Sequence, residues 1–143
     1  QEIFREMIQF SDEIDLPLVV HSRDAMDDSL ELLKEKEGEV IIHCFAGNEE
    51  HAKEALDRDY YISLGGVIYK AKKKYRKILK HVPLENLLLE TDAPFLSKRG
   101  SNRSEPWFIK DVAKTIAEIK DLEFSEVWNK TGKNAEKVFD LPL

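Results

Sequence analysis

The chain has very little cysteine: Cys44 is the only one among 143 residues. A single thiol excludes an intrachain disulfide and a zinc site built from several cysteines, so we expect a reducing compartment such as the cytoplasm. The longest apolar runs are far too short to cross a bilayer, and the first residues lack the basic and apolar segments of a signal peptide. We therefore expect a soluble, cytoplasmic protein with no membrane partner.

The chain also lacks an excess of positive charge. The 22 Lys and Arg residues are outnumbered by 28 Asp and Glu residues, which leaves a net charge of −6. This balance excludes a globally basic surface, so a nucleic acid would have to meet a local patch or a bound cation. Linkers rich in Pro or Gly are also absent, and we expect one domain over residues 1–143. The chain does not begin with Met, so we expect it to be part of a longer polypeptide.

Four short apolar runs have the pattern of buried parallel strands, and helical periodicity fills the sequence between them. The strands are expected at residues 18–21, 40–43, 60–64 and 87–92, and the helices at about 1–14, 25–36, 48–58, 71–82, 104–116 and 125–138. Alternation of this kind predicts an α/β fold with a parallel sheet and right-handed crossovers. Four such units make either a small open sheet or half of an eight-stranded barrel.

Three of these strands end in residues that bind metals, namely His21, His43 and Asp92. Each histidine alone is more often a buried, hydrogen-bonded residue, and Asp92 alone is a plausible cap for the turn at Pro94. The carboxyl ends of parallel strands meet at one edge of a sheet, where α/β proteins build their active sites. The three together therefore indicate a divalent-metal site, with Asp92 also able to accept a proton from water. A metal-assisted hydrolase is the leading hypothesis.

Four further residues are candidates for supporting roles. Glu90 shares a strand face with Asp92 and is expected to orient a ligand rather than bind metal itself. Arg23 follows a metal-binding strand end and suits either a substrate phosphate or a structural carboxylate partner. Gly65 and Gly66 end a strand, where backbone N–H groups could approach an anion, although a plain turn is the default interpretation.

Basic residues are concentrated in two segments. The stretch Lys70–Lys80 is most simply a solvated helix face, and it is also a local candidate for contact with a nucleic acid backbone. Lys98, Arg99 and Arg103 lie closer to the expected site, and we rank them above the helix for substrate contact. Cys44 is expected to be a buried residue on the face of its strand that points away from the site.

The motifs around these strand ends match those of one known family. The matching segments are residues 17–25, 42–47, 61–66 and 87–94. Residues Arg103-Ser104-Glu105-Pro106 are similar to the Arg-Asn-Glu-Pro motif of the same family and depart from it at Ser104. On this combination, the chain resembles the TatD-type metal-dependent deoxyribonucleases over essentially its whole length.

The resemblance implies a (β/α)8 TIM barrel, of which this chain would supply the C-terminal half, about four βα units corresponding to strands 5–8. It also implies two divalent metal ions (Zn, Mg or Mn) and hydrolysis of phosphodiester bonds, typically in DNA. On the matching positions, His21 and His43 would hold one metal, while Asp92 would hold the other and act as general base. Arg103 and Glu105, from the fifth motif, would support the ligands or the substrate.

The family normally takes a His-x-His pair from its first strand and a bridging Glu from its fourth, and nothing in this sequence matches either. We therefore expect the complete protein to be a nuclease and the isolated chain to be inactive or very weak. We also expect the open sheet edges to drive homodimer formation. Two alternatives stay open: a barrel hydrolase that acts on a C–N or ester bond, and a non-catalytic fragment that binds metal or a partner.

Overall fold

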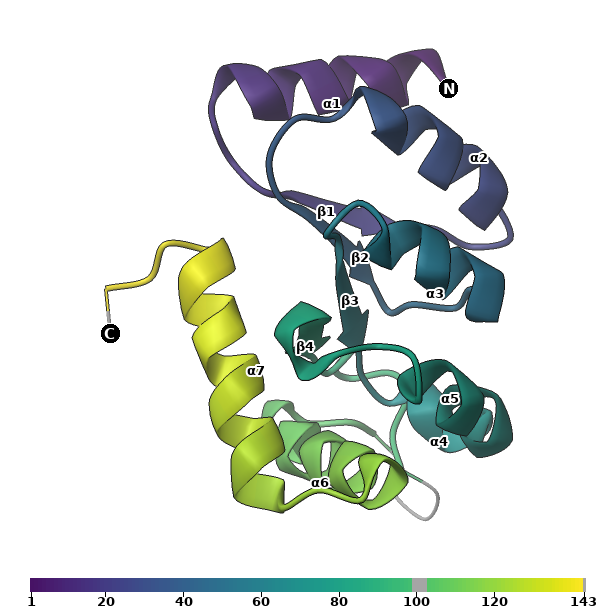
Figure 1. Ribbon diagram of the computed structural model, residues 1–143, viewed down its shortest axis with the longest axis vertical. Helices are drawn as coiled ribbons and strands as arrows, with labels where there is room; N and C mark the ends of the chain where they lie inside the picture. The colour runs from purple at the N-terminus through teal and green to yellow at the C-terminus, as the bar shows by residue number, and fades with distance from the viewer. Residues whose placement is uncertain (99–102, 143) are drawn as a thin grey trace.

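A parallel four-stranded sheet forms the centre of the molecule (Figure 1). The computed structural model describes residues 1–98 and 103–142. The strands follow the chain in spatial order β1-β2-β3-β4, and every neighbouring pair is parallel. Their bounds are β1 (Leu18–His21), β2 (Val40–His43), β3 (Tyr61–Leu64) and β4 (Leu87–Leu89). The predicted α/β fold with a parallel sheet is confirmed.

Helices connect the strands because each parallel connection must cross back over the sheet. They are α1 (Glu2–Glu13), α2 (Met26–Leu32), α3 (Glu49–Leu56), α4 (Val67–Lys70), α5 (Lys72–Leu79), α6 (Ile109–Lys120) and α7 (Phe124–Val138), with the short 3-10 helices η1 (Leu33–Glu35), η2 (Leu84–Asn86) and η3 (Pro106–Phe108). Helices α2, α3 and α5 lie on one side of the sheet and α7 lies on the other (Figure 1). Within residues 1–98 and 103–142, none of the helices is both long and apolar enough to cross a membrane.

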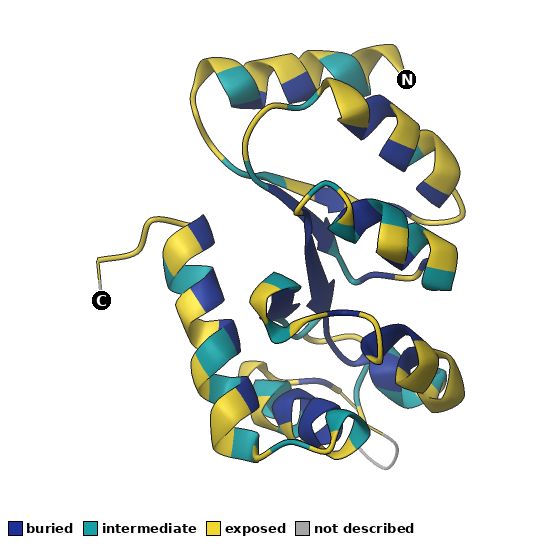
Figure 2. Ribbon diagram, viewed as in Figure 1, coloured by how far each residue is buried: buried dark blue, intermediate teal, exposed yellow. Residues whose placement is uncertain are grey.

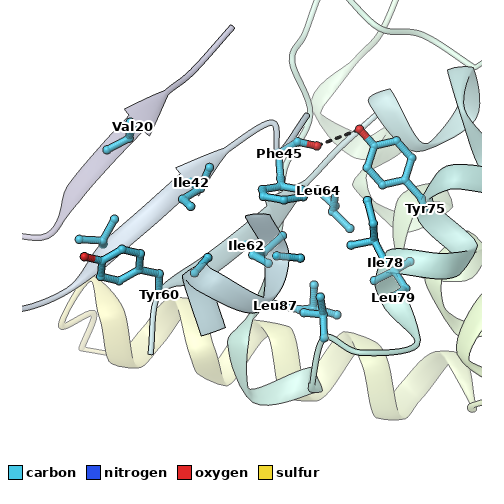
Figure 3. Close-up of a cluster of buried hydrophobic side chains, with 14 of the residues drawn as sticks. Val20, Ile42, Phe45, Tyr60, Ile62, Leu64, Tyr75, Ile78, Leu79 and Leu87 are labelled. Atoms are coloured by element: carbon cyan, nitrogen blue, oxygen red, sulfur yellow. Dashed lines mark hydrogen bonds between the residues drawn. The ribbon is translucent and has the colours of Figure 1, made fainter. Parts of the chain in front are cut away.

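The larger core lies between the sheet and the helices α2, α3, α5 and α6. Successive strand residues point to opposite faces, so alternate side chains of each strand enter this core. Those drawn in Figure 3 include Val20, Ile42, Ile62, Leu64 and Leu87. Strands β2, β3 and β4 are largely buried, β1 is partly exposed, and the outer faces of the helices are exposed (Figure 2). Each fully buried Leu or Ile contributes about 1.5–3 kcal/mol to stability.

The opposite face of the sheet carries a smaller cluster under α7. Ile41, Tyr61 and Leu88 pack there against Val138 and Ala135. By the two-residue period of a strand, His43 and Ser63 project from this same face, beyond Ile41 and Tyr61. The face under α7 therefore leads directly to the strand ends that carry the candidate site.

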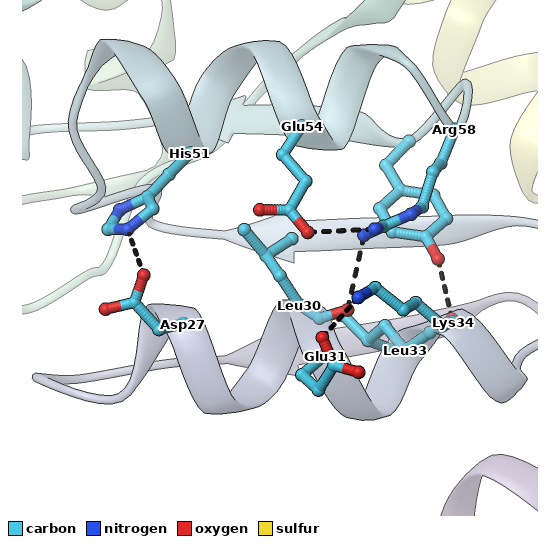
Figure 4. A network of polar contacts seen from close by, with 9 residues as sticks. Asp27, Leu30, Glu31, Leu33, Lys34, His51, Glu54 and Arg58 are labelled. Atoms are coloured by element: carbon cyan, nitrogen blue, oxygen red, sulfur yellow. Dashed lines mark hydrogen bonds and ion pairs between the residues drawn. The ribbon is translucent and has the colours of Figure 1, made fainter.

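Polar contacts tie α2 to α3 (Figure 4). Asn48 is the N-cap of α3, as its sequence position predicts, and its side chain accepts a hydrogen bond from the His51 backbone N–H at 2.9 Å. His51 Nδ1 accepts in turn from the Asn48 N–H at 3.2 Å, and Nε2 lies 2.8 Å from Asp27 Oδ1. Both ring nitrogens of His51 are thus occupied by structural contacts.

Three of the expected element boundaries are wrong. Ser104 does not cap a helix: it is buried, its N–H donates to the Pro94 carbonyl at 2.9 Å, and the helical segment begins at Pro106. The helix expected over 71–82 is α5, which ends earlier, at Leu79, and a separate short helix, α4, precedes it because the backbone leaves the helical region at Ala71, with φ −136°. The last strand ends at Leu89, so the acidic residues beyond it lie on irregular backbone.

Candidate active site

The ends of β1 and β2 place two histidines side by side. His21 and His43 are direct partners in the parallel register, and their ring centroids lie 5.6 Å apart. The His43 side chain is about one-quarter exposed, at 26%, and His21 is exposed. Both imidazoles therefore lie at the carboxyl edge of the sheet, where solutes can reach them.

The orientation of His43 is set by Glu90, which directly follows β4. His43 Nδ1 lies 2.7 Å from Glu90 Oε2. A carboxylate can only accept a hydrogen bond, which assigns the ring proton to Nδ1 and leaves a lone pair on Nε2. This Nε2 lies 3.8 Å from Asp92 Oδ1, too far for a hydrogen bond. His43 Nε2 and the Asp92 carboxylate are therefore both available as ligands that would hold divalent metal.

Glu90 is itself held from β3. Its Oε2 also accepts a hydrogen bond from Ser63 Oγ at 2.5 Å, and the Glu90 side chain is only 15% exposed. Its second oxygen, Oε1, is buried and has no hydrogen-bond partner among the described residues. A buried carboxylate oxygen without a partner is costly unless a donor or a cation meets it. The geometry thus favours a positively charged or hydrogen-bonding ligand close to Glu90.

His43 and Asp92 present side-chain groups of the kinds that bind divalent metal ions. Across residues 1–98 and 103–142, no three His, Cys, Asp or Glu side chains converge closely enough to hold a metal ion. The side chains of His21, His43 and Asp92 therefore do not converge on one point. His43 faces Asp92, and the His21 ring lies next to the His43 ring. An imidazole nitrogen and a carboxylate oxygen suit zinc and related divalent ions. The residues present fit such an ion, with further coordination positions open.

An open cleft of about 430 Å³ lies next to this pair. Its lining joins His21 and Asp92 to two cations, Arg23 and Lys70, and to Phe95, which is 69% exposed. A neighbouring cleft of similar volume is bordered by another lysine, Lys74, and by His51. The cleft therefore combines metal-binding groups with positive charge, an arrangement that suits an anionic substrate.

The loop after Asp92 contributes Phe95 and Leu96 to the lining of the cleft. Arg103, Glu105 and Lys98 are exposed and are not among the described residues that line it, and Arg99 lies outside the described residues. The basic residues that line the cleft within the described part of the chain are Arg23 and Lys70. Substrate contact by the basic residues of the loop stays a prediction.

Cys44 also lines the cleft, contrary to its expected place on the far face of a strand. The reason is that β2 ends at His43 and the chain turns at Cys44 through a left-handed conformation, with φ +48°. Burial raises the pKa of the Cys44 thiol to about 11, and the negative charges of Glu90 and Asp92 act in the same direction.

Gly65 and Gly66 allow the segment after β4 to approach β3. A Cβ on Gly66 would lie 1.8 Å from the backbone oxygen of Leu96. A Cβ on Gly65 would lie 3.0 Å from both Cγ and the backbone oxygen of Glu90. The structure thus places both glycines at close packing contacts, and it gives no contact that would support the anion-binding alternative within the described residues.

Ser63 is the residue of this site that the sequence analysis did not select. Its signal is a single serine in the run Tyr61–Leu64, on the strand face that leads to the histidines. A buried serine alone is a weak signal because most such hydroxyls bond to nearby backbone. Only the folded structure shows that this one reaches Glu90.

Comparison with known proteins gives consistent matches. A protein-family model described as "TatD related DNase" matches residues 1–140. The chain is 41% identical to the "Uncharacterized metal-dependent hydrolase YabD" of Bacillus subtilis (strain 168), over 97% of this chain and 57% of that protein. It is 35% identical to the human "Deoxyribonuclease TATDN3", over 97% of this chain and 51% of that protein. The chain therefore spans about half the length of the curated relatives it matches.

Solved structures give the same result for the fold. The crystal structure of YJJV, a TatD homologue from Escherichia coli K12, superimposes with a TM-score of 0.86 at 27% identity. That match covers 96% of this chain and 55% of the other. A TatD family hydrolase from Entamoeba histolytica, at 24% identity, has the same fold with a TM-score of 0.85.

Proposed function

This chain belongs to the TatD-related family, and from that premise we propose that it carries part of the active site of a divalent-metal-dependent hydrolase that cleaves phosphodiester bonds in DNA. The observation that carries the proposal is the arrangement of His43, whose Nδ1 is bound to Glu90 while Nε2 faces Asp92 Oδ1 at 3.8 Å. The human relative named a deoxyribonuclease supports DNA as the substrate class.

We infer that the four βα units correspond to strands 5–8 of an eight-stranded barrel. The match to only 55% of the Escherichia coli chain supports this inference, as does the strictly sequential order of parallel strands. Both β1 and β4 have one free edge in the described sheet, as strands at the break of a barrel would.

In the proposed site, His21 and His43 hold one divalent ion and Asp92 holds a second. Such ions supply positive charge that stabilises the developing charge on a phosphodiester. Asp92 accepts a proton as the oxygen of a water attacks phosphorus and the P–O ester bond breaks, and the departing oxygen takes a proton from solvent. Arg23 and Lys70, which line the cleft, neutralise the phosphate and position it.

The test is cleavage of labelled DNA in the presence of Mg²⁺, Mn²⁺ or Zn²⁺. The assay uses this chain and, where its gene encodes a longer polypeptide, that polypeptide as well. We expect metal-dependent cleavage by the longer protein and little or none by the 143-residue chain. His43→Ala and Asp92→Ala should each lower the rate by about 100-fold or more, since each removes a metal ligand. Full activity in both variants would refute the assignment.

Two alternatives make different predictions in the same experiments. A hydrolase acting on a C–N or ester bond would cleave amide or carboxylic ester substrates faster than phosphodiesters, and the cations Arg23 and Lys70 in the cleft argue against it. A non-catalytic fragment would bind metal weakly and show no turnover in any form. Tight binding of two ions per monomer would contradict that last alternative.

A further inference from the structure

Strand β3 supplies no metal ligand in the proposed site, yet its residue Ser63 and Gly65, which directly follows the strand, both contact Glu90. Ser63 donates its hydroxyl to Glu90 Oε2, and Gly65 lies against the Glu90 Cγ and backbone oxygen. We propose that Ser63 is a positioning residue: its hydroxyl fixes the Glu90 carboxylate, which in turn holds His43 with the proton on Nδ1 and Nε2 free for metal. The significance for metal binding rests on the function proposed above.

The Ser63–Glu90 contact has the properties of a strong, oriented hydrogen bond. The Oγ–Oε2 distance of 2.5 Å lies at the short end of the range for a hydroxyl bound to a carboxylate, about 2.5–2.7 Å. Ser63 is only 3% exposed, so water does not compete readily for the hydroxyl. The oxygen that accepts this bond is the same Oε2 that contacts His43 Nδ1 at 2.7 Å. One carboxylate oxygen therefore joins β3 to the candidate ligand on β2.

Gly65 restricts the same carboxylate from a second direction. Ser63 and Gly65 are two residues apart along an extended chain, so they border the same side of β3. A Cβ at position 65 would lie only 3.0 Å from the Glu90 Cγ. Because Gly65 has no Cβ, the Glu90 side chain can occupy its observed position. The hydroxyl and the missing Cβ thus confine Glu90 between them. Glu90 Oε1, buried and without a hydrogen-bond partner among the described residues, contributes nothing to this confinement.

A purely structural role for Ser63 would have different consequences. In that case, removal of the hydroxyl would lower stability but would leave the imidazole proton of His43 on the same nitrogen. A positioning role predicts that the proton redistributes, because a loosened Glu90 no longer selects Nδ1–H. The tautomer of His43 therefore separates the two roles without any assay of catalysis.

The experiment is long-range ¹H–¹⁵N NMR of the ¹⁵N-labelled chain at pH about 8.5, above the ordinary histidine pKa of about 6.5. The His43 signals are assigned by their loss in His43→Gln. We expect wild-type His43 to be predominantly the Nδ1–H tautomer and Ser63→Ala to give a mixture of tautomers. Ser63→Thr, which restores a hydroxyl, should return the signal toward wild type.

Ser11→Ala is the matched control. Ser11 is also a buried serine, at 6% exposure, but its hydroxyl donates to the Ile8 carbonyl within α1, far from β3 in the sequence. This variant should leave the His43 tautomer unchanged. In a parallel titration, Ser63→Ala should weaken Zn²⁺ binding about 10- to 100-fold, the usual effect of losing a group that orients a ligand, whereas Ser11→Ala should not.

A folded Ser63→Ala protein with the wild-type tautomer would overturn the proposal. If that variant does not fold, Ser63→Cys replaces it, because a thiol has similar size but is a weak donor, and the same shift is expected. These measurements involve no DNA, so they fail or succeed independently of nuclease activity. A tautomer shift in this chain, combined with no metal-dependent cleavage of DNA by the longer polypeptide, would refute the proposed function and support the role of Ser63.

Discussion

Two glycines with opposite surroundings illustrate how single residues shape this molecule. A Cβ atom added to Gly66 would lie 1.8 Å from the Leu96 backbone oxygen, which is a severe steric clash. The same atom on Gly132, in α7, would meet no described atom within 4 Å. Gly66 is therefore required for the approach of the segment that carries Asp92, whereas Gly132 only adds freedom to the unfolded chain.

Alanine substitutions at these two glycines should have opposite effects. Gly66→Ala should lower the free energy of unfolding by about 1–3 kcal/mol, because the backbone on one side must shift. Gly132→Ala should raise it by about 0.5–1 kcal/mol, since alanine favours the helix. Urea denaturation of both variants measures these changes, and a neutral Gly66→Ala would show that the 90–96 segment is less tightly packed than described.

At the level of elements, Tyr75 links α5 to the turn that follows β2 (Figure 3). Its hydroxyl donates to the Phe45 carbonyl at 2.8 Å, and the side chain is only 1% exposed. Burial raises the pKa of the Tyr75 phenol to about 12, with the nearby Cys44 thiolate acting in the same direction. The turn that carries Cys44 and Phe45, directly beyond His43, is thus held by α5.

The contact between Tyr75 and Phe45 should make the free energy of unfolding of the protein depend on pH in the alkaline range. The folded state keeps the Tyr75 proton to a higher pH than the unfolded state, so the contribution is complete below pH 10 and is lost as pH rises toward 12. The free energy of unfolding of Tyr75→Phe should fall less between pH 10 and pH 12 than that of the wild type, because the variant has no phenol to ionise. At pH 7 the variant should be about 1 kcal/mol less stable than the wild type, because it lacks the hydrogen bond to Phe45. Urea unfolding at several pH values measures both; an identical alkaline loss in wild type and variant would contradict the burial of this phenol.

The elements also show what the sequence could and could not predict. Hydrophobic periodicity was sufficient to predict the parallel strands, and the start of the helix at about residue 48 agrees with the preference of asparagine for N-cap positions, because both depend on local patterns. Serine is a residue type that often caps helices, but Ser104 instead donates its backbone N–H to the Pro94 carbonyl. That contact depends on how a long loop packs, which no local pattern specifies. The link from Ser63 to Glu90 joins residues 27 positions apart, and no local pattern specifies it.

At the scale of the whole molecule, β1 has an unpaired edge in the described sheet, and exposed apolar side chains lie on β1 and on α1. Val19 in β1 is 52% exposed, and Ile3 and Phe10 of α1 are 74% and 50% exposed. An uncovered strand edge with apolar neighbours favours association. We therefore predict that the 143-residue chain forms homodimers in solution.

Light scattering with a charged variant tests this association. Val19→Lys should shift the chain toward monomer, because a lysine on an edge strand opposes pairing. Lys53→Arg, which keeps the charge of α3, is the control and should leave the mass unchanged. A wild-type chain that is a monodisperse monomer at all concentrations would rule the dimer out.

The central claim is that His43 and Asp92 are ligands of a divalent-metal site, and anomalous X-ray diffraction from crystals soaked in zinc tests it most directly. The account predicts anomalous peaks within about 2.2 Å of His43 Nε2 and of Asp92 Oδ1. The same soak of Asp92→Ala crystals should weaken or remove the peak beside residue 92. Zinc bound only elsewhere, for example at His81, with no peak at either His43 or Asp92, would contradict the account.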